Sequence, residues 1–151
     1  MTRPRHQARE AALQILYFWE VGRAQPISAI DAYFAEHLPD ASDDVKGFAS
    51  RLVLGTIADV AELDSLIEQH SRHWRVDRLA VIDRLVLRLA IWELRHESGT
   101  PPAAVINEAL ELARRFSGEE AVKFVNGVLD AVRKTVDMAD VPASDAANPS
   151  D

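Results

Sequence analysis

The sequence predicts an all-α protein of six or seven helices arranged in two packed bundles. Apolar residues recur at three- and four-residue steps along most of the chain, which is the period of an amphipathic helix. No segment alternates apolar and polar residues as a half-buried strand does, and no internal repeat is present. The chain has 151 residues, 48% of them hydrophobic. That size suits one domain, or two small helical units that share a core.

Two helices are predicted before a break at residues 37–40. Residues 8–19 place their apolar side chains on one face, and Gly22 lies near the end of this helix. Pro26 permits a second helix, because proline is well tolerated in the first helical turn.

One long helix is predicted after the break. Ser42 is a good N-cap, and the two aspartates that follow it suit the positive end of the helix dipole. A continuous apolar stripe runs over residues 45–67 and fades near residues 70–73. Gly55 can bend this helix, but no proline interrupts it.

The second half of the chain predicts a central buried helix followed by two more. Residues 77–97 are apolar on nearly all sides, which favours burial on most faces. Residues 99–102 form a turn that leads into the next helix. Ser117 and Glu120 then form a predicted capping box at the start of the last helix, which ends after Lys134.

These elements define one domain over residues 1–135. We expect an N-terminal bundle over about residues 4–73 and a C-terminal bundle over about residues 77–135. The remaining residues, 136–151, form a predicted disordered acidic tail. The chain carries 24 acidic and 17 basic residues, a net charge of −7, so any contact with a nucleic acid must be local.

Several kinds of chemistry are not expected. The chain has no cysteine, which excludes disulfides, cysteine-based metal sites and thiol nucleophiles. It has no glycine-rich phosphate loop, no apolar run near the ~20 residues of a membrane span, and no signal-peptide pattern. A cytoplasmic protein without a cofactor is therefore expected. His70 and His73 share a helix face but have no evident third metal ligand. Glu108 and Glu111 leave open a hydrolase alternative, which has only the carboxylate spacing in its favour.

The N-terminus carries the first candidate RNA-binding residues, Arg3, Arg5, His6, Arg9 and Tyr17. Guanidinium groups bind phosphates and stack on bases, and an aromatic ring on the same helix can add stacking. A solubilising basic start with the tyrosine in the core is the alternative. If these residues bind RNA, replacing Arg9 with alanine should weaken RNA binding and leave folding intact.

Residues 123–130 form the second unusual stretch. Asn126 and Gly127 are adjacent within a helical pattern, where glycine costs about 1 kcal/mol relative to alanine. The glycine can allow two helices to approach closely. The asparagine can either bond across a helix interface or present its amide to a base.

The third feature is the polar set on the apolar helix, namely Asp83, Arg84, Arg88 and Arg95. The three arginines lie on one side of the helix at four- and seven-residue steps. An ion pair within the protein, with Glu108 or Glu111, is expected for Arg88. Asp83 and Arg84 are expected to face a protein partner.

Four stretches resemble the bacterial transcription antitermination factor NusB family. They are AREAALQILY (8–17), DRLVLRLAIWEL (83–94), VINEALELA (105–113) and KFVNGVLD (123–130). Their order and spacing fit the family over roughly residues 4–134.

The resemblance implies a two-bundle helical protein without catalytic activity. It implies binding, with ribosomal protein NusE, to the boxA element of nascent RNA, and joining RNA polymerase and other Nus factors, notably on ribosomal RNA operons. A protein-interaction scaffold or homodimer with an occluded RNA surface is the alternative.

The resemblance also assigns residues. It maps an arginine-rich RNA-binding start onto residues 5–9, which His6 and Gln7 interrupt. It places on the RNA side Arg9, Tyr17, Phe116, Lys123, Phe124 and Asn126. It places on the side of the protein partner Asp83 and Glu120.

Overall fold

The chain folds entirely into helices. The computed structural model describes residues 3–71 and 75–147, with side chains for residues 4–71 and 75–135. Within these residues it contains seven α-helices, one short 3-10 helix and no strand, so the predicted all-α fold class is confirmed. The elements are α1 (Arg3–Gly22), α2 (Pro26–His37), α3 (Asp43–Ala58), α4 (Val60–His70), η1 (Val76–Arg78), α5 (Val81–His96), α6 (Pro102–Phe116) and α7 (Glu119–Ala147).

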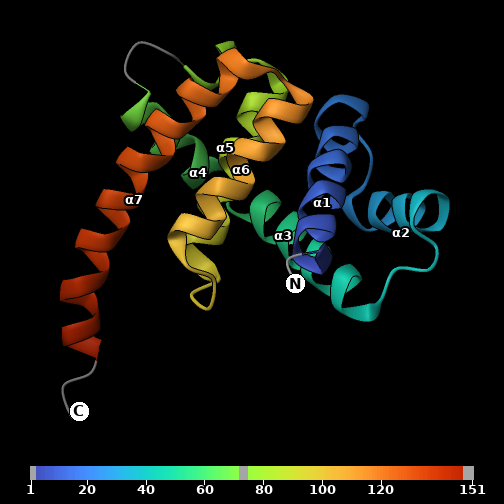
Figure 1. The fold of residues 1–151 in the computed structure, drawn as a ribbon, viewed down its shortest axis with the longest axis horizontal. Coiled ribbons are helices and arrows are strands. Elements are labelled where there is room, and N and C mark those ends of the chain that lie inside the picture. The colour runs from blue at the N-terminus through green and yellow to red at the C-terminus, as the bar shows by residue number, and fades with distance from the viewer. Residues whose placement is uncertain (1–2, 72–74, 148–151) are drawn as a thin grey trace.

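Helix α5 is the centre of the molecule. It packs against α1, α3, α4, α6 and α7, and its nine consecutive residues 85–93 are all buried. Helices α1, α2 and α3 pack together on one side of α5, and α6 and α7 pack on the other (Figure 1). The prediction of a central helix buried on most sides is confirmed, because a helix apolar all round is stable only inside a core.

The predicted long third helix is two helices. Helix α3 ends at Ala58 and α4 begins at Val60, with Asp59 between them. Helix α4 packs mainly against α5 and α7, although the sequence-based boundary at residue 73 grouped it with the first bundle. The apolar stripe continues across the break, so hydrophobic periodicity alone could not reveal it.

Gly55 of α3 accommodates a tryptophan of α5. A β-carbon built on Gly55 would lie 2.2 Å from Cε2 of Trp92 in α5. Trp92 is buried, and its ring stacks on His96 with centroids 4.7 Å apart. Only glycine permits this contact between α3 and α5.

The junction of α6 and α7 differs from the predicted capping box. Ser117 is the C-cap of α6, and its N–H donates to the carbonyl of Ala113 at 2.8 Å. Gly118 follows with a φ of 130°, and its N–H donates to the same carbonyl at 2.9 Å. A left-handed residue that closes a helix in this way is usually glycine. The expectation for Gly127 is also wrong, because this residue is exposed and its β-carbon position has nothing within 4 Å.

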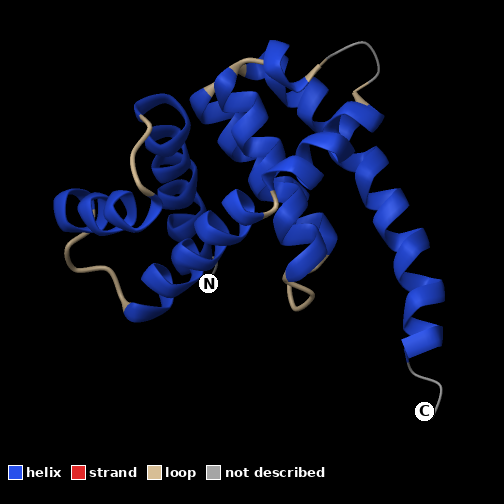
Figure 2. Cartoon of the chain, turned by 180° about the vertical axis from the view of Figure 1, so that it is seen from behind, coloured by secondary structure: helices blue, strands red, loops and turns tan. Residues whose placement is uncertain are grey.

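Helix α7 continues beyond the predicted end of the domain. Its backbone is helical to Ala147, whereas the sequence predicted disorder from residue 136, and residues 148–151 lie outside the described part. The last turns project away from the other helices (Figures 1 and 2). No glycine or proline follows Lys134 until Pro142, so nothing local stops the helix earlier. Among the described helices, none has the length and hydropathy that a bilayer span needs.

Candidate nucleic-acid interface

The start of α1 lies against α3, and Arg5 is exposed there. The guanidinium carbon of Arg5 lies 3.9 Å from the ring centroid of Phe48 in α3, within cation–π range. Arg5 and Arg9 are one helical turn apart and therefore share the face that meets α3. Arg3 is the first residue of α1, but its side chain lies outside the described residues.

Arg9 is buried and not on the surface, which does not match the expectation that it faces RNA. Only 5% of the residue is exposed, and Nε donates to Oε1 of Glu93 in α5 at 2.9 Å. Nη2 donates to Oε2 of Glu93 at 2.6 Å, and Nη1 lies 3.7 Å from Oε1 of Glu108. The side chain joins α1 to α5 through a buried bidentate ion pair.

His6 and Arg115 tie the same part of α1 to α6. Nδ1 of His6 lies 2.9 Å from Oε1 of Glu108, and its Nε2 lies 3.0 Å from Oε2 of Glu10. Arg115 donates to the Glu10 carboxylate as well. Carboxylates of the protein itself therefore hold the guanidinium groups of Arg9 and Arg115 and the imidazole of His6.

Phe48 and Arg51 were not identified from the sequence. Phe48 is 3% exposed, and the guanidinium carbons of Arg9 and Arg51 lie 5.5 and 5.2 Å from its ring centroid. Together with Arg5, they surround this ring with three guanidinium groups. The spacing of Phe48 and Arg51, three residues apart on α3, places them on one face. Nothing in the sequence indicated that this face meets α1.

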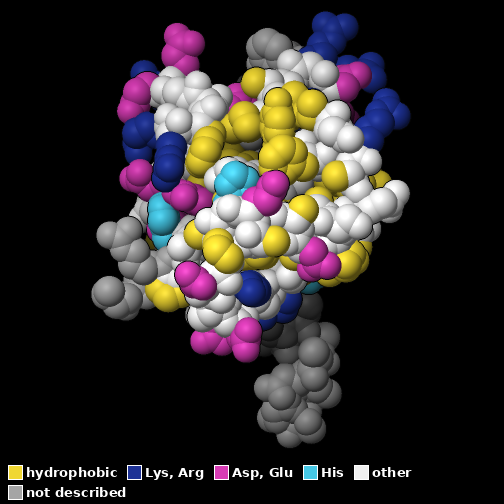
Figure 3. Space-filling model, turned by 90° about the vertical axis from the view of Figure 1, so that its right-hand side faces the viewer, with side chains coloured by type: hydrophobic (Ala, Val, Ile, Leu, Met, Phe, Trp, Pro, Cys, Tyr) yellow, Lys and Arg dark blue, Asp and Glu magenta, His cyan; other side chains and the backbone are white. Residues whose placement is uncertain are grey.

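Tyr17 is exposed, which excludes the alternative that placed it in the core. It is 40% exposed, and its neighbour Phe18 is 47% exposed. The two rings pack edge to face with centroids 6.4 Å apart. The side of the molecule formed by α1 and α2 shows hydrophobic side chains gathered between charged ones (Figure 3).

The predicted residues of α6 and α7 lie on neighbouring helices. Phe116, at the end of α6, is half-buried, and the guanidinium carbon of Arg115 lies 5.2 Å from its ring centroid. Lys123 and Asn126 of α7 are exposed, whereas Phe124 is half-buried against the core. Within the described part of the chain, the Asn126 amide has no hydrogen-bond partner, so no bond across a helix interface holds it. Helices α6 and α7 pack closely, and the RNA role of these residues stays a prediction.

The residues predicted to face a protein partner have different environments. Arg84 pairs with Glu20 of α1 at 2.9 Å and donates to the carbonyls of Val76 and Leu79, each at 3.3 Å. Its guanidinium group is therefore bonded to groups within the protein and contributes to the packing of α5 against α1. Oδ1 of Asp83 is buried and has no hydrogen-bond partner among the described residues, whereas Glu120 is exposed in the first turn of α7.

Arg88 forms the expected ion pair within the protein, but with other partners. It donates to Asp64 of α4 at 2.7 and 2.9 Å and to Glu20 of α1 at 3.2 Å, not to Glu108 or Glu111. Burial disfavours the charged guanidinium, but the Asp64 and Glu20 carboxylates together raise the pKa of Arg88 above its usual value. The arginine side of α5 thus faces α1 and α4.

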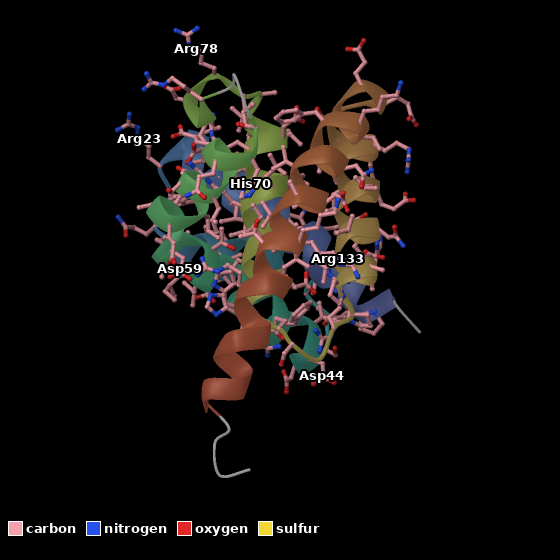
Figure 4. All side chains as sticks on the ribbon, turned by 90° about the vertical axis from the view of Figure 1, so that its left-hand side faces the viewer. Arg23, Asp44, Asp59, His70, Arg78 and Arg133 are labelled. Atoms are coloured by element: carbon pink, nitrogen blue, oxygen red, sulfur yellow. The ribbon has the colours of Figure 1, made fainter. Side chains whose placement is uncertain are left out.

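His70 and Glu111 are also engaged within the protein. Nδ1 of His70 lies 2.9 Å from the carbonyl of Leu66, and Nε2 lies 3.1 Å from Oγ1 of Thr135, so the ring sits beside α7 (Figure 4). His73 lies outside the described residues. Among the residues that are described, no three histidine or acidic side chains are grouped to hold a metal ion. Glu111, from the proposed carboxylate pair, binds Arg114.

A protein-family model and curated relatives both match this chain to NusB proteins. The family model described as "NusB family" matches residues 6–134. The chain is 47% identical to the transcription antitermination protein NusB of Solibacter usitatus (strain Ellin6076) over 91% of this chain and 94% of that protein. It is 44% identical to the protein of that name from Myxococcus xanthus (strain DK1622) over 85% of this chain and 93% of the relative.

Solved structures share the fold. A structure described as antitermination factors NusB and NusE in complex with dsRNA aligns with a TM-score of 0.82 and 32% identity. The alignment covers 89% of this chain and 99% of that one. A structure described as T. maritima NusB aligns with a TM-score of 0.78 and 33% identity, covering 86% of this chain and 90% of that one.

Proposed function

Because the chain belongs to the NusB family, we propose that it is a transcription antitermination factor that binds boxA RNA together with ribosomal protein NusE. This complex joins RNA polymerase and other Nus factors in the cytoplasm, notably during ribosomal RNA transcription. The observation that carries the proposal is the exposed guanidinium of Arg5 on a fold shared with a NusB solved with NusE and dsRNA.

The charge distribution supports dependence on NusE. The protein carries a net charge of −7, and carboxylates of the protein hold Arg9 and Arg115 near the start of α1. RNA affinity depends on cations that neutralise phosphates. Few such cations remain free on this surface, so we expect weak binding by the isolated protein and selective binding by the complex with NusE.

Fluorescence anisotropy with a boxA RNA and a scrambled RNA of equal length, with and without NusE, tests the proposal. We expect at least a tenfold preference for boxA when NusE is present. Lys123→Gln should weaken that binding several-fold. Lys134→Gln, which removes an exposed lysine paired with Asp130 farther along α7, is the control. Equal affinity for both RNAs in the presence of NusE would falsify the proposal.

A self-associating scaffold is the second candidate, and one surface favours it. Phe18, Val21 and Ile27 are large apolar residues exposed on α1 and α2. Phe18 and Tyr33 also line a hollow of about 370 Å³. Light scattering at two protein and two salt concentrations distinguishes the candidates. A stable dimer that does not bind boxA RNA with NusE would favour the scaffold.

A further inference from the structure

Two exposed arginines from different helices converge on one aromatic ring. Arg5 comes from α1 and Arg51 from α3, and both guanidinium carbons lie within 5.2 Å of the Phe48 centroid. The two groups are therefore separated by less than about twice that distance. Such a separation lets them contact one phosphate, or two consecutive phosphates of a single strand.

The ring holds the guanidinium groups and is not itself available to a base. Phe48 is 3% exposed, so a base cannot stack on it without displacing the arginines. Stacking on a fixed ring restricts the conformations of a long side chain. Less entropy is then lost when a ligand binds. Arg5 and Arg51 are thus arranged in advance for an anion.

The carboxylate that holds Arg51 is a weak competitor. Nε and Nη2 of Arg51 donate to Glu97 at 3.2 and 3.3 Å, and the Arg51 side chain is 53% exposed. These bonds are longer than the 2.7–2.9 Å usual between charged groups, and exposed ion pairs contribute little to stability. The buried Arg9–Glu93 pair, at 2.6 Å, is the opposite case.

We propose that Arg5 and Arg51 together bind the phosphodiester backbone of the RNA, and that RNA phosphate replaces Glu97 as the partner of Arg51. The inference rests on the proposed function and extends its site from α1 to α3. Planar guanidinium groups suit phosphate oxygens, which they bind bidentately. Backbone contacts carry no sequence information, so this pair supports affinity for any RNA that the complex holds.

The first test is Arg51→Gln, measured in the complex with NusE on boxA and scrambled RNA over a range of salt concentrations. We expect both affinities to fall about fivefold at 0.1 M salt. The slope of log affinity against log salt concentration is negative, and its magnitude should become smaller by about 0.7, the value for one phosphate contact on a single strand. Arg51→Lys should recover part of the loss.

Arg78→Gln is the control for the change in net charge. Arg78 is exposed at the opposite end of the molecule from Asp44, which lies at the start of α3 (Figure 4). This variant should leave affinity and salt slope within twofold of the unsubstituted protein. Thermal unfolding followed by circular dichroism verifies that each variant is folded.

The second test is Glu97→Gln, which has the opposite expected sign. Removing the competing carboxylate should raise RNA affinity two- to threefold, and the gain should vanish when Arg51→Gln is added. If Arg51 only supports the fold, Glu97→Gln gives no gain. Unchanged affinity and slope in Arg51→Gln, with boxA selectivity intact, overturn this inference alone. If the unsubstituted protein, in the complex with NusE, does not prefer boxA RNA to scrambled RNA, the proposed function is overturned as well.

Discussion

Arg9 of α1 and Glu93 of α5 form a buried bidentate ion pair between the two halves of the protein, with bonds of 2.9 and 2.6 Å. Glu93 is 1% exposed, so its carboxylate has little access to water. A buried charge left without its partner is strongly destabilising, even where the intact pair contributes little. The sequence-based expectation that Arg9→Ala leaves folding intact therefore needs replacement.

Arg9→Ala should lower the free energy of unfolding by about 3–5 kcal/mol. Urea unfolding followed by circular dichroism measures this change. The double variant Arg9→Met with Glu93→Leu removes both charges and keeps the volume, and it should recover most of the loss. A single variant as stable as the unsubstituted protein would contradict the role of this pair in folding.

Gly55→Ala should destabilise the protein although alanine is the better helix former. The new β-carbon would meet the buried ring of Trp92, and overpacking of this kind typically costs about 1–3 kcal/mol. Gly47→Ala in the same helix is the matched control, because nothing lies within 4 Å of its β-carbon position. It should stabilise by about 0.5–1 kcal/mol. Equal effects of the two substitutions on the melting temperature would show that Trp92 imposes no constraint.

Thr56→Val should stabilise the protein. Thr56 is 0% exposed, and its hydroxyl has no hydrogen-bond partner among the described residues. A buried hydroxyl without a partner carries a desolvation penalty of about 1–3 kcal/mol, which an isosteric methyl group removes. We expect a gain of about 1 kcal/mol in chemical unfolding. A loss of stability would mean that the hydroxyl is bonded in solution.

Tyr33 should make stability fall at alkaline pH. Burial, and secondarily the Glu10 carboxylate, raise the pKa of Tyr33 above its ordinary value of 10.0, although Arg115 acts in the opposite direction. The native state then favours the neutral phenol. The resulting stabilisation is present below pH 10.0 and is lost as pH rises through the folded-state pKa.

Tyr33→Phe keeps the ring and removes this titration. The free energy of unfolding should then decline less steeply above about pH 10. Urea unfolding at a series of pH values measures the slope, and Tyr17→Phe, which removes an exposed phenol, controls for the substitution. Identical slopes for Tyr33→Phe and the unsubstituted protein would refute the assignment.

The sequence predicted the helices well because their signals are local. Apolar spacing and caps such as Ser42, whose hydroxyl accepts from the N–H of Val45 at 3.2 Å, depend only on neighbours in the chain. The break at Asp59 was missed because the apolar stripe passes through it. The role of Gly55 was missed because it depends on Trp92, which lies on another helix.

The candidate site was predicted less completely for the same reason. An arginine near the N-terminus is available to bind RNA only if it does not form an ion pair with an acidic residue of the protein. Arg5 and Arg9 look equivalent in the sequence, yet Arg5 is exposed beside the buried ring of Phe48 and Arg9 is buried with Glu93. The sequence did not indicate a binding role for Arg51, because its position beside Arg5 depends on how α1 and α3 pack together.

Val76, in the connection between α4 and α5, is bonded to a residue of each helix. Glu68 of α4 accepts the N–H of Val76 at 3.0 Å, and Arg84 of α5 donates to the carbonyl of Val76. These two bonds connect Val76 to both helices. Lengthening a loop costs only about 0.6 kcal/mol per doubling. A fluorescent label or an affinity tag inserted just before Arg75 should therefore leave the anchoring of Val76 intact.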